Sequence, residues 1–317
     1  LGVARSFARY NHDVLNNPKL KIVFNDGRNY LLTTREKFDV ITADPIHPWF
    51  SGAGYLYSDE YFRLAAAHLN PGGVIAQWLP LYELTDQNLK SVVKTFSNNF
   101  KYTMVWVTHY DAILIGSNDP ITLDEAELER RINVPAIRQD LEAVFMGSAE
   151  DLLSYFLMGN RGVAAYSGSG IINTDNNLYL EFSAPQSIGN SGLMASNIAE
   201  LFNFREGLLP YLSSPIERTG SAVHTGKWLQ NLKAAAATDP AYVMFIAGDS
   251  GAPEFSSRLA GLTATYPTYA RSRFLRNEIA RAKSIEPRLL QQLELTLRNS
   301  DGTTAKVHFC AVMSRLS

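Results

Sequence analysis

Short apolar runs and stretches of helical spacing alternate over the first 118 residues of this chain, and this alternation restricts the folds open to it. Apolar runs joined by helix-length connections are typical of parallel strands with crossover helices. Only four residues join the last two runs, which favours a hairpin. The sequence therefore predicts a doubly wound α/β sheet whose last strand runs antiparallel. The predicted strands are Lys21–Phe24, Phe38–Ala43, Val74–Leu79, Tyr102–Val107 and Ala112–Ile115, and the predicted helices span about 1–15, 58–69 and 85–96.

The rest of the chain is expected to be mainly helical. Apolar residues recur at helical spacing over 121–158, whereas 160–192 is rich in Gly, Ser and Asn and predicts loops with one short strand at Leu178–Phe182. We place a domain boundary near residue 190, which gives a partial α/β domain at 1–190 and a helical domain at 191–317. A tetratricopeptide-like array is left open for the second domain. Prolines 210, 215, 240, 253, 267 and 287 are expected to break its helices, and arginines 271, 273, 276 and 281 to form a solvated helix face.

Composition argues against several classes of protein. The chain has 29 Lys and Arg against 31 Asp and Glu, and a net charge of −2 gives no overall basic character for nucleic-acid binding. Its one cysteine, Cys310 in a predicted terminal strand, excludes an internal disulfide and a cysteine-based metal cage. The six histidines lack metal-ligand spacing, so no metal site is predicted. No window approaches the ~18 apolar residues of a membrane helix, and the predicted location is cytoplasmic.

Polar groups stand at the ends of three predicted strands, and the carboxyl ends of parallel strands share one edge of a sheet. We therefore expect Asn25-Asp26-Gly27, Asp44 and Gln77 to lie on one rim. Gly27 would let a flat ligand approach while Asp26 accepts from an exocyclic amine, although a turn that caps the next helix explains this pair equally well. Asp44 ends a strand that we expect to be buried on both faces. Its partly desolvated carboxylate suits proton transfer from an attacking amine, with a turn or helix cap as the alternative.

An aromatic loop follows Asp44. Its two glycines, Gly52 and Gly54, predict either a flap that closes over a ligand or simple turns. His47 would contact substrate or titrate near neutrality, although a plain surface histidine is the more common reading of such a residue. Gln77 is explained by strand packing as well as by a binding role. The aromatic residues of the loop are Trp49, Phe50, Tyr55 and Tyr57.

Four segments, taken in order and spacing, resemble the spermidine/spermine synthase family: Asn25–Leu31, Phe38–Asp44, Leu56–Phe62 and Asn70–Val74. Ile172–Asn176, followed by Leu180–Pro185, is similar to the bacterial branch of that family that is fused behind membrane-spanning segments. The resemblance covers about residues 1–188 and implies a Rossmann-like, methyltransferase-type sheet. The family's glycine-rich turn and acidic ribose-binding residue are absent, so we expect the N-terminal strands of that sheet to be missing. The start at Leu1 favours a chain cut from a longer gene product, in which a membrane tether is left open.

The resemblance implies transfer of an aminopropyl group from decarboxylated S-adenosylmethionine to a polyamine such as putrescine, with no tightly bound cofactor. Carried over, Asp44 would bind or deprotonate the attacking amine, and Asn25, Asp26 and Gly27 would hold the adenosyl group. The amine site would include His47, Tyr57 and Gln77. Other synthases carry a second aspartate at the position of His47, so this chain has a weaker clamp for a cationic polyamine.

Three functional readings remain open from the sequence. The first is the aminopropyltransferase, with little or no catalysis expected of the isolated 317-residue chain. The second is a methyltransferase that uses S-adenosylmethionine itself, because the same scaffold serves both reactions. The third is a non-catalytic module that binds polyamines or a protein partner. A homodimer is left open for each of them.

Overall fold

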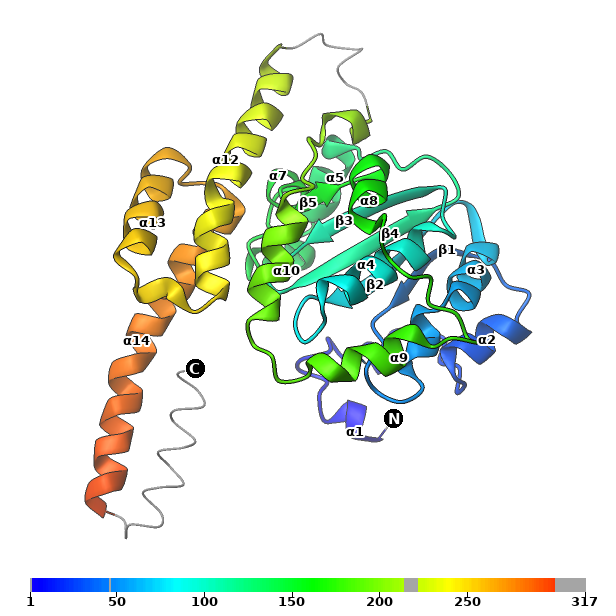
Figure 1. Cartoon of the computed structure of the whole chain (residues 1–317), viewed down its shortest axis with the longest axis horizontal. Coiled ribbons are helices and arrows are strands. Elements are labelled where there is room, and N and C mark those ends of the chain that lie inside the picture. The colour runs from blue at the N-terminus through cyan, green and yellow to red at the C-terminus, as the bar shows by residue number, and fades with distance from the viewer. Residues whose placement is uncertain (1, 46, 214–221, 300–317) are drawn as a thin grey trace.

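A five-stranded sheet flanked by helices forms the centre of the computed structural model, which describes residues 2–45, 47–213 and 222–299 (Figure 1). The strand order is β1-β2-β4-β3-β5, with β1 parallel to β2 and both β4 and β5 antiparallel to β3. The chain thus has a Rossmann-like, methyltransferase-type α/β fold, and the predicted hairpin is confirmed. The strands are β1 Phe38–Ala43, β2 Leu69–Pro80, β3 Tyr102–Val107, β4 Asp111–Ser117 and β5 Phe156–Met158.

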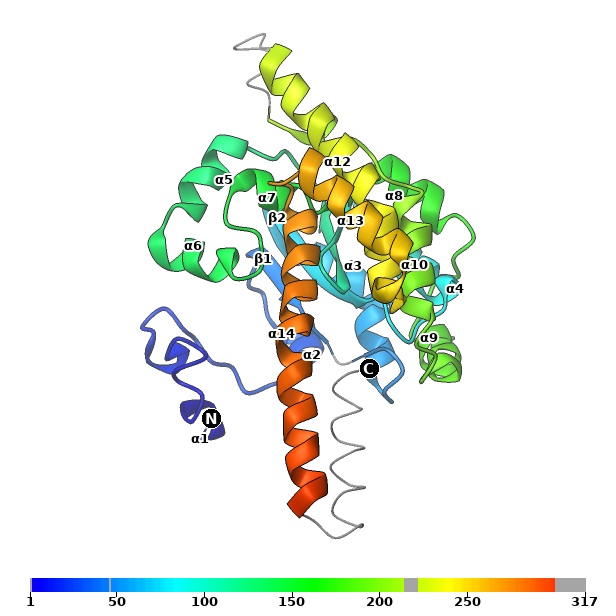
Figure 2. The same cartoon turned by 90° about the vertical axis from the view of Figure 1, so that its left-hand side faces the viewer.

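Helices cover both faces of this sheet (Figure 2). On one side lie α3 (Asp59–Ala67), α4 (Asp86–Ser97) and α8 (Asn160–Ser167), and on the other lie α5 (Glu125–Ile132), α6 (Pro135–Glu142) and α7 (Ala149–Leu153). Between the sheet and the layer that contains α5 and α7 is a mainly apolar cavity of about 460 Å³. The starts of α3 and α4 follow from local sequence, because Ser58 and Thr85 each accept a hydrogen bond from the third residue of the helix.

The C-terminal part is helical, as predicted. Its main helices are α10 (Leu193–Phe202), α12 (Ala222–Ile246), α13 (Pro253–Thr265) and the long α14 (Ala270–Asn299), and the last three pack against one another (Figures 1 and 2). One hydrophobic cluster runs from the sheet into α12 and α14. The domain boundary near residue 190 and the tetratricopeptide-like arrangement remain predictions. Cys310 lies outside the described residues.

Three predictions for the N-terminal region are wrong. Residues 21–24 do not form a strand, because no strand in the described part of the chain lies beside them, and Phe24 is 80% exposed. Residues 1–15 do not form one helix: α1 covers only Gly2–Arg5, and a short 3₁₀ turn follows at Val14–Asn16. An apolar stripe stabilises a helix only when another element covers it. Burial of β1 on both faces, which the sequence predicted, is also wrong. No described strand lies beyond β1, so it is an edge strand of the described sheet, and Val40 is 58% exposed.

Tertiary contacts also overturn four predictions further along the chain. The end of the predicted 121–158 helix is β5, which pairs with β3 and is buried. The predicted strand at 178–182 is instead helical, as α9 (Tyr179–Ser183), and α8 lies within the predicted loop region. Prolines 240 and 287 lie inside α12 and α14 rather than at breaks, whereas 253 and 267 do stand at helix ends. Short apolar runs carry no local signal that separates helix from strand.

The predicted arginine face of α14 is wrong at its first member. The Arg271 side chain is 2% exposed, and its guanidinium donates to the Val107 carbonyl at 2.7 Å. Asp239 lies 3.6 Å from it, and the Tyr242 ring centroid lies 4.6 Å away. Arg273 pairs with Asp151 at 2.6 Å, whereas Arg281 is exposed. Arg271 therefore fastens α14 to the carboxyl end of β3.

Candidate functional site

Three strand ends meet at one edge of the sheet. The parallel strands β1 and β2 end there, with Ala43 paired to Gln77. The antiparallel strand β4 begins at the same edge, with Asp111 opposite Pro80. Asp44, which directly follows β1, therefore lies on the same rim as the end of β2 and the start of β4. This is the part of an open α/β sheet where ligands bind.

Tyr57 is the buried neighbour of the exposed Asp44. Its side chain is fully buried, and its hydroxyl has no hydrogen-bond partner among the described residues. Burial, reinforced by the charge of Asp44 nearby, raises the pKa of Tyr57 far above its usual value. The hydroxyl therefore stays protonated and is free to donate a hydrogen bond beside Asp44.

His47 is packed among aromatic rings and is not a free surface histidine. Its Nε2 shares a hydrogen bond with the Tyr82 hydroxyl at 2.7 Å. Its ring stacks on Trp49 with centroids 4.4 Å apart and meets the edge of Trp78 at 5.2 Å. Position 47 thus contributes an imidazole inside an aromatic wall.

Gln77 presents an unused acceptor. Its side chain is fully buried in β2, and its amide nitrogen donates to the Trp78 carbonyl at 3.3 Å. Its carbonyl oxygen Oε1 has no hydrogen-bond partner in the described part of the chain. A buried acceptor without a partner is costly unless a ligand or water completes it.

Asp111 belongs to the same rim, and the sequence reasoning missed it. The pKa of this carboxyl group is raised, mainly by burial. A hydrogen bond from Trp78 lowers it in part, the Asp44 charge raises it slightly, and the His47 charge lowers it slightly. The signal was available, because the first residue of an antiparallel strand lies at the same edge as the last residues of its parallel neighbours. Tyr82, which follows β2, was missed in the same way.

Asp26 lies apart from this cluster as the cap of a helix. Its Oδ1 accepts from the Asn29 amide at 2.9 Å and begins α2 (Gly27–Thr33), as the capping alternative expected. Asn25, Asp26 and Gly27 are all exposed. Because residues 21–24 form no strand, Asp26 does not follow a strand of the described sheet. Burial raises the pKa of Tyr61 to about 12, and the charge of Asp26 adds to this rise.

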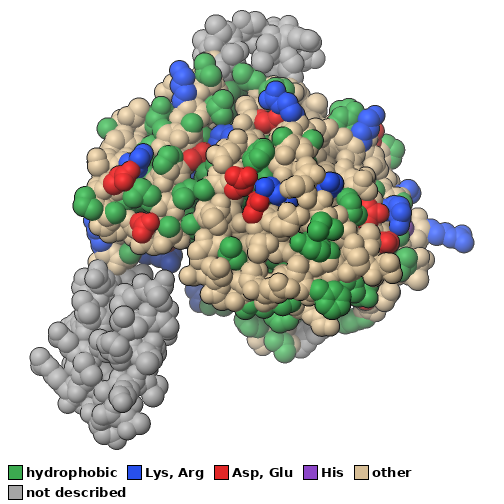
Figure 3. Space-filling view, viewed as in Figure 1, with side chains coloured by type: hydrophobic (Ala, Val, Ile, Leu, Met, Phe, Trp, Pro, Cys, Tyr) green, Lys and Arg blue, Asp and Glu red, His purple; other side chains and the backbone are tan. Residues whose placement is uncertain are grey.

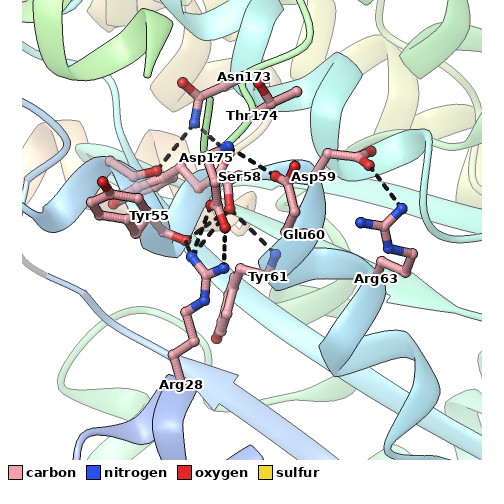
Figure 4. A network of polar contacts seen from close by, with 12 residues as sticks. Arg28, Tyr55, Ser58, Asp59, Glu60, Tyr61, Arg63, Asn173, Thr174 and Asp175 are labelled. Atoms are coloured by element: carbon pink, nitrogen blue, oxygen red, sulfur yellow. Dashed lines mark hydrogen bonds and ion pairs between the residues drawn. The ribbon is translucent and has the colours of Figure 1, made fainter. Parts of the chain in front are cut away.

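A polar network anchors α2 to the loop that carries Tyr57 (Figure 4). Arg28 pairs with both carboxylate oxygens of Asp175 and donates to the Tyr55 carbonyl at 3.0 Å. The Asp175 amide donates to Glu60 at 2.9 Å. The pair with Arg28 lowers the pKa of Asp175. A segment 147 residues distant in sequence thus fixes the helix that Asp26 caps.

Asn173 holds the aromatic loop from inside. Its fully buried side chain donates to the carbonyls of Gly54 and Tyr57, both at 3.1 Å, and accepts from the Leu180 amide at 3.1 Å. Glu181 accepts from the Gly52 amide at 3.1 Å, and Gly52 adopts a positive φ of 81° that favours glycine. The loop predicted as a flap is therefore tied to the segment 173–181 at both of its glycines.

Two further searches concern the described residues only. No group of three His, Cys, Asp or Glu side chains in the described ranges is placed to hold a metal ion. None of the helices described is long and apolar enough to cross a bilayer. On the face seen in Figure 3, acidic and basic side chains are intermingled.

Known proteins similar to this chain share its N-terminal part. The model of the spermine/spermidine synthase domain matches residues 1–117. The polyamine aminopropyltransferase of Aeropyrum pernix is 31% identical over 129 residues, which are 38% of this chain and 41% of that protein. That of Buchnera aphidicola is 27% identical over 135 residues, 40% of this chain and 47% of its own. Thermospermine synthase ACAULIS5 of Arabidopsis thaliana is 28% identical over 138 residues, 40% of this chain and 41% of its own.

The chain spans less than half the length of each of these relatives. The matched region contains β1 to β4, and with them Asp44, His47, Tyr57, Gln77 and Asp111. The similarity thus covers the whole rim described above. Through residues 1–117, the chain is similar to the spermine/spermidine synthase domain.

Proposed function

We propose that this protein transfers an aminopropyl group from decarboxylated S-adenosylmethionine to an amine such as putrescine. The observation that carries the proposal is the meeting of Asp44, the unpartnered Tyr57 hydroxyl and the unpartnered Gln77 carbonyl on one rim of the sheet. Similarity of the N-terminal part to proteins named polyamine aminopropyltransferases supports it.

The reaction needs a base and close positioning more than it needs a strong nucleophile. The amine nitrogen forms a bond to the aminopropyl carbon while the bond from that carbon to sulfur breaks, and methylthioadenosine leaves. The sulfonium is already a good leaving group, so holding the two substrates in line supplies most of the rate. The proton lost by the amine passes to the Asp44 carboxylate, which lies near the neutral Tyr57 hydroxyl.

The adenosyl group would lie against Asn25, Asp26 and Gly27. The Asp26 oxygen Oδ1 is used by the helix cap, so the adenine amino group would donate to Oδ2. The space beside the Gly27 Cα is open, because a Cβ atom added there would meet nothing within 4 Å. A planar base can therefore approach the backbone at this turn. Decarboxylated S-adenosylmethionine is a co-substrate here, and no tightly bound cofactor is proposed.

The amine would pass between Asp44 and the aromatic wall that contains His47. Because the His47 imidazole shares a hydrogen bond with Tyr82 and stacks on Trp49, it would contact the substrate through its ring, not as a second carboxylate. Tyr57 and Gln77 would complete the amine site with one donor and one acceptor.

The test is aminopropyl transfer to putrescine by the purified protein. Asp44→Asn should lower kcat by about 10²-fold to 10⁴-fold, the range for loss of a positioned base. The matched control is Asp39→Asn on β1, the strand that Asp44 follows; Asp39 is an exposed carboxylate that accepts only from Asn70 in the described structure.

Parallel assays with S-adenosylmethionine separate this function from methyl transfer. Transfer of a methyl group, with no product from the decarboxylated form, would replace the proposal by the methyltransferase. The absence of both products, together with no binding of either adenosyl compound, would favour a non-catalytic module. An Asp44→Asn protein as active as the Asp39→Asn control would remove Asp44 from the mechanism.

A further inference from the structure

The apolar cavity of about 460 Å³ on one face of the sheet has no role in the function proposed above. Strands β2, β3 and β4 form its floor, and Leu128 of α5 and Leu152 of α7 form part of the opposite wall. None of the residues that line it belongs to the adenosyl site or to the amine site. The cavity is therefore a feature of the fold that the transfer reaction leaves unexplained.

The floor of the cavity is an apolar sheet face that the helices cover only in part. Ile113 and Ile115 of β4 line the cavity and are half-buried, whereas their neighbours Ala112 and Leu114 are fully buried. Successive side chains of a strand point to opposite faces, so the two isoleucines share the face that is less well covered. Trp106 of β3 lines the cavity and is half-buried in the same way.

The walls of the cavity offer a ligand no charge. No Asp, Glu, Lys or Arg side chain is among the described residues that line it. The Thr108 hydroxyl already donates to a backbone carbonyl at 3.1 Å, and the Tyr155 hydroxyl lies 3.5 Å from Nε2 of His109. A charged group buried here would lose its hydration without gaining a partner, so the walls select an uncharged molecule. Two flexible thioether side chains that adapt to the shape of a ligand complete the lining, Met104 and Met146.

The volume favours a small molecule over a segment of another protein. An engineered apolar cavity of about 150 Å³ in an unrelated protein stays free of water and takes up benzene. This cavity has about three times that volume, which gives room for about two or three rings. A single turn of an α-helix, about 10 Å across and about 5.4 Å long, would already fill a similar volume. A partner helix therefore does not fit between the sheet and the opposite wall.

We propose that this cavity binds an uncharged molecule of about two or three aromatic rings. The isoleucine side chains of the floor contact one face of the molecule, and the leucines of α5 and α7 contact the other. The Trp106 ring adds an aromatic contact to this burial of apolar surface. The site goes beyond the proposed function, because it lies on the face of the sheet and uses none of the residues of the rim.

The experiment compares two fluorescent probes that share one ring system. N-phenyl-1-naphthylamine is uncharged, whereas 8-anilinonaphthalene-1-sulfonate carries a sulfonate on the same rings. Each probe is titrated into the protein and excited directly. The uncharged probe should bind with a stoichiometry of about one and at least about 10-fold more tightly than the sulfonate, because the walls hold no charge that could pair with it.

Tryptophan substitutions on opposite walls should fill the cavity. Ile115→Trp on β4 and Leu128→Trp on α5 should each weaken binding of the uncharged probe at least about 10-fold. The matched control is Ile137→Trp on α6, which makes the same change at a side chain that is 45% exposed and does not line the cavity. It should bind the probe as wild-type protein does. Circular dichroism identifies a variant that has not folded, in which case the other filled variant carries the test.

Several results would overturn the proposal. They are equal affinity for the two probes, no binding of the uncharged probe, several probe molecules bound per chain, or unchanged binding in the folded variants that fill the cavity. An equal loss of binding in Ile137→Trp would place the probe elsewhere and would overturn it as well. No substrate of the transferase is present, so the result does not depend on whether aminopropyl transfer occurs.

Discussion

Replacing Asn173 by alanine should loosen the loop that carries Tyr57 and destabilise the whole fold. The side chain makes three hydrogen bonds to buried backbone groups, at 3.1 Å to Gly54 and to Tyr57 and at 3.1 Å from Leu180. At about 1 kcal/mol net for each bond, the loss is about 3 kcal/mol in the free energy of unfolding. The alanine side chain cannot form hydrogen bonds, so these three backbone groups remain without partners unless water enters the space left by the asparagine side chain.

Urea unfolding followed by circular dichroism measures this loss. The matched control is Asn176→Ala, the same substitution at an exposed position three residues further along the chain. It should change the free energy of unfolding by no more than about 0.5 kcal/mol, as is usual for surface positions. A loss below about 1 kcal/mol for Asn173→Ala would refute the assignment of this side chain as the anchor of the loop. The same would follow if both variants lost equal stability.

Two further predictions concern the contact between α14 and the sheet. Arg271→Met should cost about 3 kcal/mol of stability, because it removes one partner of the partly buried Asp239 and the bond to Val107, whereas Arg281→Met on the exposed surface should cost less than about 0.5 kcal/mol. Equal effects of the two arginine variants in thermal unfolding would contradict this role. His109 stacks on Phe274 at 4.0 Å, and burial lowers its pKa from 6.5 to about 4. The unfolded chain therefore takes up the proton first, so stability should be full above about pH 6.5 and fall by about 3 kcal/mol towards pH 4. Urea titrations across this range should show a weaker pH dependence in His109→Gln, and an unchanged dependence would assign the loss to other groups.

The candidate site divides into residues that local reasoning found and residues that it missed. Asp44 and Gln77 were predicted because the end of an apolar run marks the end of a strand, and β1 and β2 end where predicted to within about a residue. Asp26 was ambiguous between a ligand and a cap, since both readings use the same Asp-Gly pair. Only the contact with Asn29 shows that the cap is formed.

Asp111 and Asn173 were missed for a different reason. Asp111 matters because β4 inserts antiparallel between β2 and β3, which places its first residue at the carboxyl ends of the other strands. Asn173 looks like one of many polar residues in a loop, yet it is fully buried against a segment 116 and 119 residues earlier in the chain. No local pattern encodes a partner at that distance.

The amino-acid sequence by itself determined the elements whose signals lie within a few residues: the apolar strands β1 to β4, the capped starts of α3 and α4, and the carboxylate that follows β1. The tertiary structure alone decided which apolar segments gained a partner. Residues 21–24 stayed unpaired, whereas Phe156–Met158 became a strand against β3. It also buried Arg271 and brought Asp111 to Asp44. Strand pairing and burial depend on what lies alongside a segment, and chain folding brings those neighbours from positions far away in the sequence.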